Sequence, residues 1–319
     1  MNRKDDTDTV PHIPVGVYRF VFETKNGFEQ PALPGILWHS VFGKALHQIS
    51  CTQSGTECHQ CSLLHNCDYP YLFRPIAPPE SEMLRGKPAP TPHIFRYRKQ
   101  LAHRVKKGER FSMEIVIVGE AVNKLTRVIQ AVQTAGVNGI GKNRSQADLL
   151  FVEQVSENGK TVRIIEEGKL ALNSPPIVKH TVHQTDPQQE LQIKFVTPYI
   201  PSGKEYRRQF NLAHMLMGIV RRASLLQYFY TGKKLNADFL SLKSQTEIAI
   251  IRSSELKWEP HQRYSATHGN VIRRCGWSGS IDISLQSASE LWPYLFIGQW
   301  LNVGKNASMG FGRYALNKV

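Results

Sequence analysis

The sequence predicts an α+β fold of two tandem domains, because two stretches of the chain repeat one order of elements. Residues 114–155 are expected to form a strand, a helix, a glycine-containing loop and a second strand, and residues 279–316 are expected to repeat that order. The loops also share their chemistry, with Gly-Lys-Asn-Arg-Ser at 141–145 and Gly-Lys-Asn-Ala-Ser at 304–308. A similar loop sequence at the same place in the same order of elements indicates a duplicated domain.

The first domain begins with an apolar strand. Residues 15–25 place aromatic side chains on one side and valines on the other, so we expect burial on most of both faces. Pro34 and Gly35 then open a helix over 36–50, whose apolar residues recur at helical spacing. Together with the later strand and helix, this order is close to that of a ferredoxin-like domain.

The second domain starts in the same way. Residues 191–199 alternate apolar and polar side chains, as expected for a half-buried strand, and a long helical stretch follows over 206–230. We expect the boundary between the two halves at 173–189, where proline-containing segments form helices and strands poorly.

Residues 1–175 therefore form the expected N-terminal domain, and residues 185–319 form the C-terminal domain, with a glycine-rich loop at 302–313. The N-terminal domain contains two segments that do not fit the repeat. Residues 51–67 are a cysteine-rich insertion, and residues 74–110 are a proline-broken, basic connection. A connection of that length is usually functional or mobile, and its charges fit either a solvated loop or contact with RNA.

The composition indicates a polyanionic partner. The chain of 319 residues has 40 Lys and Arg residues against 26 Asp and Glu residues, a net charge of +14. The polar N-terminal segment lacks the apolar core of a signal peptide, and no apolar run approaches the ~18 residues of a membrane span. We therefore expect a cytoplasmic protein that does not associate with membranes.

Four cysteines lie close together in the insertion, and their spacing is typical of a metal site. The pattern is C-x6-C-x2-C-x5-C, formed by Cys51, Cys58, Cys61 and Cys67. A structural zinc ion is the first expectation and an iron–sulfur cluster the second, while unligated thiols or a disulfide remain open. His59 and His65 are substitute ligands, and the lone Cys275 is expected to pack as a small apolar residue. A fully ligated site has no open position for water and should not catalyse.

Four blocks of the sequence occur in an order that is typical of one protein family. They are the helix L-P-G-I-L-W-H-S-V-F-G-K with the cysteine cluster behind it, the arginine pair at 221–222, the segment from Arg263 to Gly279, and V-G-K-N-A-S-M-G-F-G-R-Y near residue 310. In this order they resemble the CRISPR-associated RAMP endoribonucleases, which cut precursor CRISPR RNA within its repeats. The resemblance spans residues 33–316 and implies two ferredoxin-like domains of the RNA-recognition type.

The resemblance also implies a reaction on RNA that needs no catalytic metal or other cofactor. Enzymes of this kind use the ribose 2′-hydroxyl as the nucleophile and leave a 2′,3′-cyclic phosphate and a 5′-hydroxyl, so DNA is not a substrate. The protein has to align the hydroxyl, remove its proton and stabilise the phosphorane. The expected partners are CRISPR repeat RNA and the crRNA product, with a CRISPR effector complex as a further candidate.

Histidines on the first helix are the candidates for proton transfer, since related enzymes carry a histidine on or beside it. His39 and His47 lie roughly 80° apart around the helix axis and about 12 Å apart along it, so they should not both touch one phosphate. We favour His39, nearer the helix start, where backbone N–H groups attract phosphate. Lys44 is a candidate for charge stabilisation, and Gly43 is expected to leave space for a backbone to pass. Ordinary packing or surface roles remain open for both histidines.

Glycines and basic residues of the C-terminal domain are the candidates for RNA binding. Glycines let a phosphate or a base approach the backbone, and arginines supply charge, although a single helical arginine more often faces solvent. The set is Gly304, Lys305, Gly310, Gly312, Arg313, Arg207, Arg208, Arg221, Arg222, Arg263, Arg273 and Arg274.

Two other functions remain open at this point. A non-catalytic RAMP subunit of a CRISPR effector complex would keep the fold and the glycine loops, and it would bind RNA without cutting it. An unrelated metal-binding nucleic-acid protein would account for the cysteines and the charge, but not for the ordered blocks. The histidine on the first helix favours the endoribonuclease, which makes guide RNAs for antiviral defence.

Overall fold

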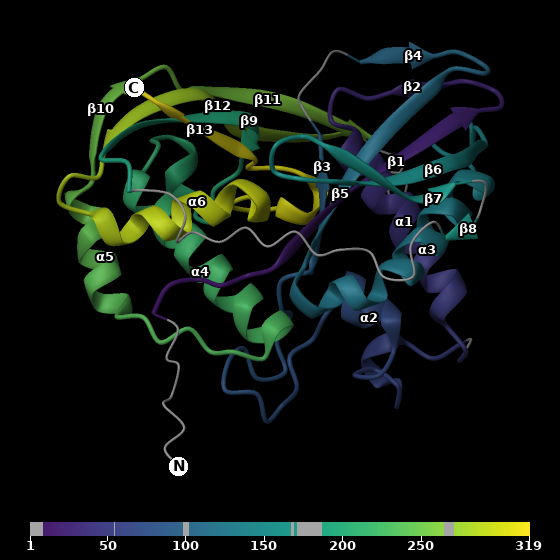
Figure 1. The fold of residues 1–319 in the computed structure, drawn as a ribbon, viewed down its shortest axis with the longest axis horizontal. Coiled ribbons are helices and arrows are strands. Elements are labelled where there is room, and N and C mark those ends of the chain that lie inside the picture. The colour runs from purple at the N-terminus through teal and green to yellow at the C-terminus, as the bar shows by residue number, and fades with distance from the viewer. Residues whose placement is uncertain (1–8, 54, 98–101, 167–168, 171–186, 265–270) are drawn as a thin grey trace. The chain divides into compact units, whose positions relative to one another are not determined.

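The computed structural model describes residues 9–53, 55–97, 102–166, 169–170, 187–264 and 271–319 (Figure 1). The chain forms two compact units. The N-terminal unit comprises Val15–Lys179 together with Ser308–Gly310, and the C-terminal unit comprises Met1–Pro14, His180–Ala307 and Phe311–Val319. The boundary expected at 173–189 lies largely outside the described residues.

The N-terminal unit is built on an antiparallel sheet with the strand order β3-β5-β1-β6-β7-β8. Strand β1 lies in its middle, because Arg19 faces Glu114 of β5 on one side and Glu153 of β6 on the other. The order of β3, β5, β1 and β6 is that of a ferredoxin-like sheet. The elements are β1 (Val15–Thr24), β2 (Phe28–Gln30), α1 (Pro34–Ser50), α2 (Asp68–Phe73), β3 (His93–Arg96), β4 (His103–Val105), β5 (Arg110–Val118), α3 (Leu125–Asn138), β6 (Ala147–Val155), β7 (Thr161–Glu166) and β8 (Lys169–Leu170).

Aromatic side chains fill the core between this sheet and its helices. Tyr18, Phe20 and Phe22 are fully buried, because alternate residues of a strand point to one face. The ring of Phe22 lies 5.2 Å from that of Trp38 on α1, which places the helix on this face. The predicted strand and helix are confirmed, with the helix beginning two residues earlier than expected, at Pro34.

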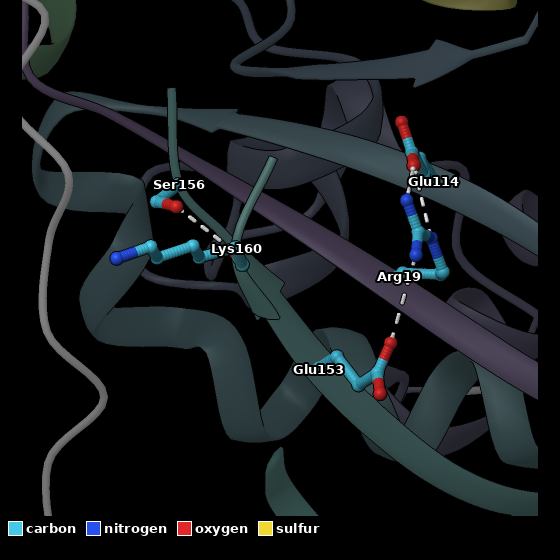
Figure 2. Close-up of polar contacts among 5 residues, drawn as sticks. All are labelled: Arg19, Glu114, Glu153, Ser156 and Lys160. Atoms are coloured by element: carbon cyan, nitrogen blue, oxygen red, sulfur yellow. Dashed lines mark hydrogen bonds and ion pairs between the residues drawn. The ribbon is translucent and has the colours of Figure 1, made fainter. Parts of the chain in front are cut away.

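The opposite face of the sheet carries ion pairs across three strands (Figure 2). Nη2 of Arg19 on β1 lies 2.8 Å from Oε1 of Glu114 on β5, and its Nη1 lies 3.7 Å from Oε2 of Glu153 on β6. At the end of β6, the hydroxyl of Ser156 donates to the carbonyl of Lys160 at 2.8 Å and closes the turn into β7. Side chains thus reinforce the backbone pairing of the central strands.

The C-terminal unit repeats this topology. Its sheet has the order β10-β12-β9-β13, with β11 also paired to β12, and its three helices lie on one face (Figure 1). Strand β9 is flanked by β12 and β13 as β1 is flanked by β5 and β6, so both units have the ferredoxin-like order that the repeat predicted. The elements are β9 (Glu190–Tyr199), α4 (Leu212–Thr231), α5 (Phe239–Ile248), β10 (Ile250–Ser254), β11 (Lys257–Tyr264), β12 (Val271–Ser284), α6 (Trp292–Leu301) and β13 (Tyr314–Lys318).

Helix α4 begins later than its apolar pattern suggests. The expected start was residue 206, whereas the helix begins at Leu212, because the side chain of Asn211 caps it and accepts a hydrogen bond from the backbone N–H of His214 at 2.7 Å. It ends at Gly232 in the left-handed conformation, with φ of +68°. Across the described part of the chain, no helix combines the length and apolar character needed to cross a membrane.

The connection expected over 74–110 contains two strands. Strand β3 pairs with β5, with His93 opposite Ile117, and supplies the edge strand of the ferredoxin-like order. Strand β4 pairs with β2 in a separate ribbon. The surrounding prolines concealed β3 from sequence reasoning, because its four residues follow directly on Pro92.

Candidate active site and RNA interface

His39 of α1 lies among the rings of two other elements of the N-terminal unit. Its ring centroid is 4.5 Å from that of Phe73, the last residue of α2, and 5.5 Å from that of His93, the first residue of β3. The side chain is half-buried. These contacts restrict the orientation of the imidazole while part of its surface stays exposed, an arrangement suited to proton transfer.

His93 completes this histidine pair, and sequence reasoning missed it. Its side chain is fully buried, and Nδ1 lies 2.7 Å from the carbonyl oxygen of Leu72, so Nδ1 carries a proton and donates it to that carbonyl. The ring is parallel to that of Phe73 to within 4°, at 5.7 Å. The sequence near His93 offered one indication, the proline that directly precedes it, and we had interpreted this segment as a connection.

Three residues of the glycine-rich loop, Ser308–Gly310, belong to the same unit. The hydroxyl oxygen of Ser308 lies 3.4 Å from Nε2 of His39. A Cβ added to Gly35 of α1, or to Gly310 of the loop, would come within 3.0 Å of the ring of Tyr97. Gly310 also has a φ of +88°, which favours glycine. The two glycines therefore allow the loop to approach α1 closely enough for Ser308 to reach His39.

The structure separates the other two candidate catalytic residues from this cluster. His47 is exposed, its ring packs edge-on against Tyr69 at 4.7 Å, and it lines a cavity with the cysteines. Lys44 is also exposed. It stands five residues after His39, which places it roughly 140° around the helix axis. Of the three predicted residues, only His39 lies beside a second histidine and a hydroxyl.

Gly43 has a different role from the one expected. We predicted that it leaves space for a passing backbone, but the ring of Phe73 fills that space, since a Cβ on Gly43 would come within 3.0 Å of three ring atoms. The glycine is thus a packing position, through which α2 lies close to α1. This packing is also what brings Phe73 beside His39.

The four cysteines of the insertion line one cavity at the end of α1. Each stands at the boundary of a helix or turn: Cys51 caps α1, Cys58 and Cys61 begin and cap a single 3-10 turn, and Cys67 caps α2. Burial raises the pKa of the Cys58 thiol, and the three neighbouring thiols raise it further. Within the described residues, no three His, Cys, Asp or Glu side chains converge closely enough to hold an ion. The thiols are therefore gathered without forming a coordination shell.

In the C-terminal unit, the glycine-rich loop is seated on the connection between β9 and α4. The backbone N–H of Lys305 donates to the carbonyl of Ile200 at 2.8 Å, and Gly304 lies so close to this carbonyl that no Cβ fits. Gly312 lies even closer to the carbonyl of Val303, and their backbones are hydrogen-bonded at 3.0 Å. Both glycines have positive φ, so both are required by the loop itself.

The same connection contacts His214, a histidine in the first turn of α4 that sequence reasoning did not single out. Nε2 of His214 lies 2.9 Å from the hydroxyl oxygen of Ser202, and its ring stacks on that of Tyr206 at 3.9 Å. Burial lowers the pKa of His214, whereas the charge of Glu205 raises it, and the net shift is downward. The imidazole of His214 is therefore neutral near neutral pH.

The predicted RNA-binding arginines differ in exposure. Arg208 and Arg221 are exposed, while Arg207 and Arg313 are half-buried. The backbone N–H of Arg313 donates to the hydroxyl of Thr197 at 2.9 Å. The side chains of Arg263, Arg273 and Arg274 lie outside the described part of the structure, although their backbones belong to β11 and β12.

Arg222 binds another part of the protein. Its Nε donates to the carbonyl of Leu301 at 2.6 Å, and burial lowers its pKa to about 10. Leu301 is the last residue of α6, directly before the glycine-rich loop. The side chain of Arg222 thus satisfies a carbonyl at the end of α6 and holds the point from which the loop departs.

Two family models match the chain. The model described as CRISPR-associated endoribonuclease Cas6 matches residues 193–314, and the model AF_1859_N, described as an N-terminal domain, matches residues 13–177. The two matches cover both ferredoxin-like units. No curated protein matches the sequence.

Solved Cas6 structures share this fold at low sequence identity. A product complex of Thermus thermophilus Cas6 (TTHB231) superposes with a TM-score of 0.50 at 13% identity, covering 95% of this chain and 99% of that one. A product complex of Cas6 (TTHA0078) superposes with a TM-score of 0.51 at 15% identity, covering 96% of this chain and 100% of that one. A partial Cas6-RT-Cas1–Cas2 complex superposes with a TM-score of 0.53 at 12% identity, covering 97% of this chain and 47% of the longer chain in that complex.

Proposed function

The chain belongs to the CRISPR-associated Cas6 endoribonucleases and carries the AF_1859-type N-terminal domain, and from this premise we propose that it cuts CRISPR repeat RNA to release guide crRNAs. The observation that carries the proposal is the cluster around His39. The ring centroid of His93 lies 5.5 Å from that of His39, and the hydroxyl oxygen of Ser308 lies 3.4 Å from Nε2 of His39. Ser308 comes from a glycine-rich loop, whose backbone gives an RNA strand close access.

The proposed reaction uses the RNA itself as the source of the nucleophile. The ribose 2′-oxygen bonds to the adjacent phosphorus while the bond from phosphorus to the 5′-oxygen breaks, which leaves a 2′,3′-cyclic phosphate and a 5′-hydroxyl. His39 takes the 2′ proton, and the leaving 5′-oxygen takes up a proton from water. Ser308 orients the imidazole. We assign no charge stabilisation to Lys44, because it is exposed and lies roughly 140° from His39 around the axis of α1. We assign no proton transfer to His47, because it faces the cysteine cavity.

The RNA is proposed to bind along the basic residues beside the loop. Lys305 is anchored by its backbone on the β9–α4 connection, which leaves its side chain to contact phosphate. Arg207 and Arg208 lie on that same connection, and Arg221 is exposed on α4. Loop glycines admit the strand, and the remaining proposed contacts are Arg313, Arg263, Arg273 and Arg274.

The test is cleavage of the repeat RNA in excess EDTA, beside the same RNA with one 2′-deoxy nucleotide before the cut. We expect one cut in the first RNA, whereas the second should bind with similar affinity and stay intact, because it lacks the nucleophile. Tight binding with no cut in either RNA, even after magnesium is restored, would instead identify a non-catalytic RNA-binding subunit. That outcome would refute the role given to His39.

A structural metal is proposed for the four cysteines. Thiolates are ligands for zinc and for iron–sulfur clusters, and a set of four leaves no position for water, as in a structural site. All four line one cavity next to the ends of α1 and α2, so an ion there would tie the insertion to both helices. We favour zinc and keep an iron–sulfur cluster as the alternative.

Metal content of the purified protein tests this second proposal. Zinc or iron in stoichiometric amount, lost in Cys58→Ser but retained in Cys275→Ser, is the expected result. Cys275 is the matched control, because it is a cysteine outside the insertion. Removal of the metal should lower the melting temperature without changing single-turnover cleavage. Visible absorption distinguishes an iron–sulfur cluster from zinc, and a protein with five titratable thiols and no metal would overturn the proposal.

A further inference from the structure

A cavity of about 440 Å³ lies in the C-terminal unit, between α6 and the edge strand β13. Its walls include the rings of Trp292 and Phe296, the amides of Gln299 and Asn317, and the side chain of Lys318. None of these residues belongs to the glycine-rich loop or to the cluster around His39. The volume is within the range of small-molecule sites, and the mixture of rings with a few polar groups is typical of them.

Helix α6 carries a row of aromatic rings, two of which, Trp292 and Phe296, line the cavity. The ring centroids of Trp292 and Phe296 are 6.0 Å apart, and those of Phe296 and Trp300 are 5.5 Å apart. Residues four positions apart share one helix face. Trp292 is only 6% exposed, whereas Phe296 is half-buried and lines the cavity. Phe296 is therefore the ring on which a flat ligand can stack.

One residue that lines the cavity has a buried polar atom without a partner in the described part of the chain. The indole Nε1 of Trp292 is buried and has no hydrogen-bond acceptor within the described residues. A buried N–H group without an acceptor is unfavourable, and native proteins seldom leave one so. Since Trp292 lines the cavity, a ligand that carries an acceptor atom can satisfy this donor.

The strand edge beside the cavity is already covered. The backbone N–H of Leu316 on β13 donates to Oε1 of Gln299 at 3.1 Å. This bond occupies a donor that an added peptide strand would need for pairing. A peptide that docks by strand addition is therefore disfavoured, whereas a flat ring with acceptor atoms fits the cavity without using the strand edge.

We propose that this cavity binds one unstacked nucleobase of the RNA, an inference that rests on the function proposed above. Phe296 stacks on the base, and Nε1 of Trp292 donates to a base acceptor. Lys318 attracts the adjoining phosphate, in keeping with the net charge of +14. The site sets the register of the RNA on the C-terminal unit and takes no part in bond breaking.

The test combines abasic nucleotides with a Phe296→Leu variant of the full chain. With the wild type, an abasic nucleotide moved along the single-stranded part of the repeat RNA should weaken binding about 5- to 150-fold at one position. With Phe296→Leu, the intact RNA should bind more weakly, and that abasic position should cause no further loss. The loss should appear in RNA affinity, since this ring does not touch the reacting atoms.

Phe239→Leu is the matched control, because Phe239 is 39% exposed on α5 and does not line the cavity. It should keep the abasic profile of the wild type. If Phe296→Leu does not fold, Trp292→Phe replaces it, since this change removes the indole donor and keeps a ring. Abasic profiles that are identical in wild type and variant, with cleavage intact, would overturn the base site and leave the proposed function standing. A wild type that binds no RNA would refute both.

Discussion

The hydroxyl oxygen of Ser308 lies 3.4 Å from Nε2 of His39, although 269 residues separate them along the chain. Both belong to the N-terminal unit, to which the glycine-rich loop contributes three residues. A hydroxyl at that distance limits rotation of the imidazole and influences which ring nitrogen carries the proton. The contact therefore joins the candidate base to the loop that is proposed to receive RNA.

His39→Ala should lower the rate of single-turnover cleavage by about 10²- to 10⁴-fold, because it removes the group that takes the 2′ proton. RNA affinity should stay within about threefold, since binding relies on basic residues elsewhere. His47→Ala is the control on the same helix, exposed and turned to the cysteine cavity, and should leave the rate nearly unchanged. An equal loss in both variants would contradict the assignment.

Gly310→Ala should reduce cleavage by more than about tenfold, because a Cβ there collides with the Tyr97 ring and the Phe95 carbonyl and displaces Ser308 from His39. Gly141→Ala is the control, with a similar φ of +74° but nothing within 4 Å of the added Cβ. It should lower the free energy of unfolding by about 1–2 kcal/mol and leave the cleavage rate unchanged. Rate measurements on refolded samples, paired with urea melts, separate the two effects.

Arg222→Ala should lower the free energy of unfolding by about 1.5–3 kcal/mol, since it removes a charged hydrogen bond to the carbonyl of Leu301. Arg221→Ala, the exposed neighbour, should change stability by less than about 0.5 kcal/mol and weaken RNA binding instead. Urea denaturation and RNA titration of both variants check this division. If Arg222→Ala instead weakened RNA binding and left stability unchanged, Arg222 would be an RNA-binding residue.

His214 should make stability depend on pH below neutrality. Burial lowers its pKa in the folded protein, so the unfolded state, with a pKa near 6.5, binds more protons in this range. The stabilisation is therefore present above about pH 6.5 and is lost as the pH falls through the lower folded value. Thermal melts between about pH 8 and 5 should show a smaller decline for His214→Gln than for the wild type. Parallel profiles would show that another group controls the dependence.

Local patterns were sufficient to predict most of the fold. The alternation of Tyr18, Phe20 and Phe22 and the repeated order of elements depend on neighbouring residues, so they appear directly in the sequence. Strand β3 was missed because four residues behind Pro92 are too few to show a period. Its place in the sheet is set by pairing with β5, a contact that the residues of β3 alone do not indicate.

The candidate site was predictable only in part. His39 followed from the family resemblance, but no local pattern indicates that His93 and Ser308 pack beside it. Arg221 and Arg222 are equivalent in sequence, and only the packing of α6 gives one of them a carbonyl to bind. Long-range packing, which sequence periodicity does not report, therefore separates positioning residues from binding residues.

The position of Ser308–Gly310 in the sequence also determines when the site is assembled during synthesis. Ser308 lies 269 residues after His39, a stretch that takes roughly 13–54 s to translate at about 5–20 residues per second. For most of that interval, once His93 has also been synthesised, the nascent N-terminal unit contains both histidines but lacks Ser308, the loop residue that contacts His39. A growing chain should therefore remain inactive toward RNA on the ribosome, and nuclease activity should begin only once the loop has docked.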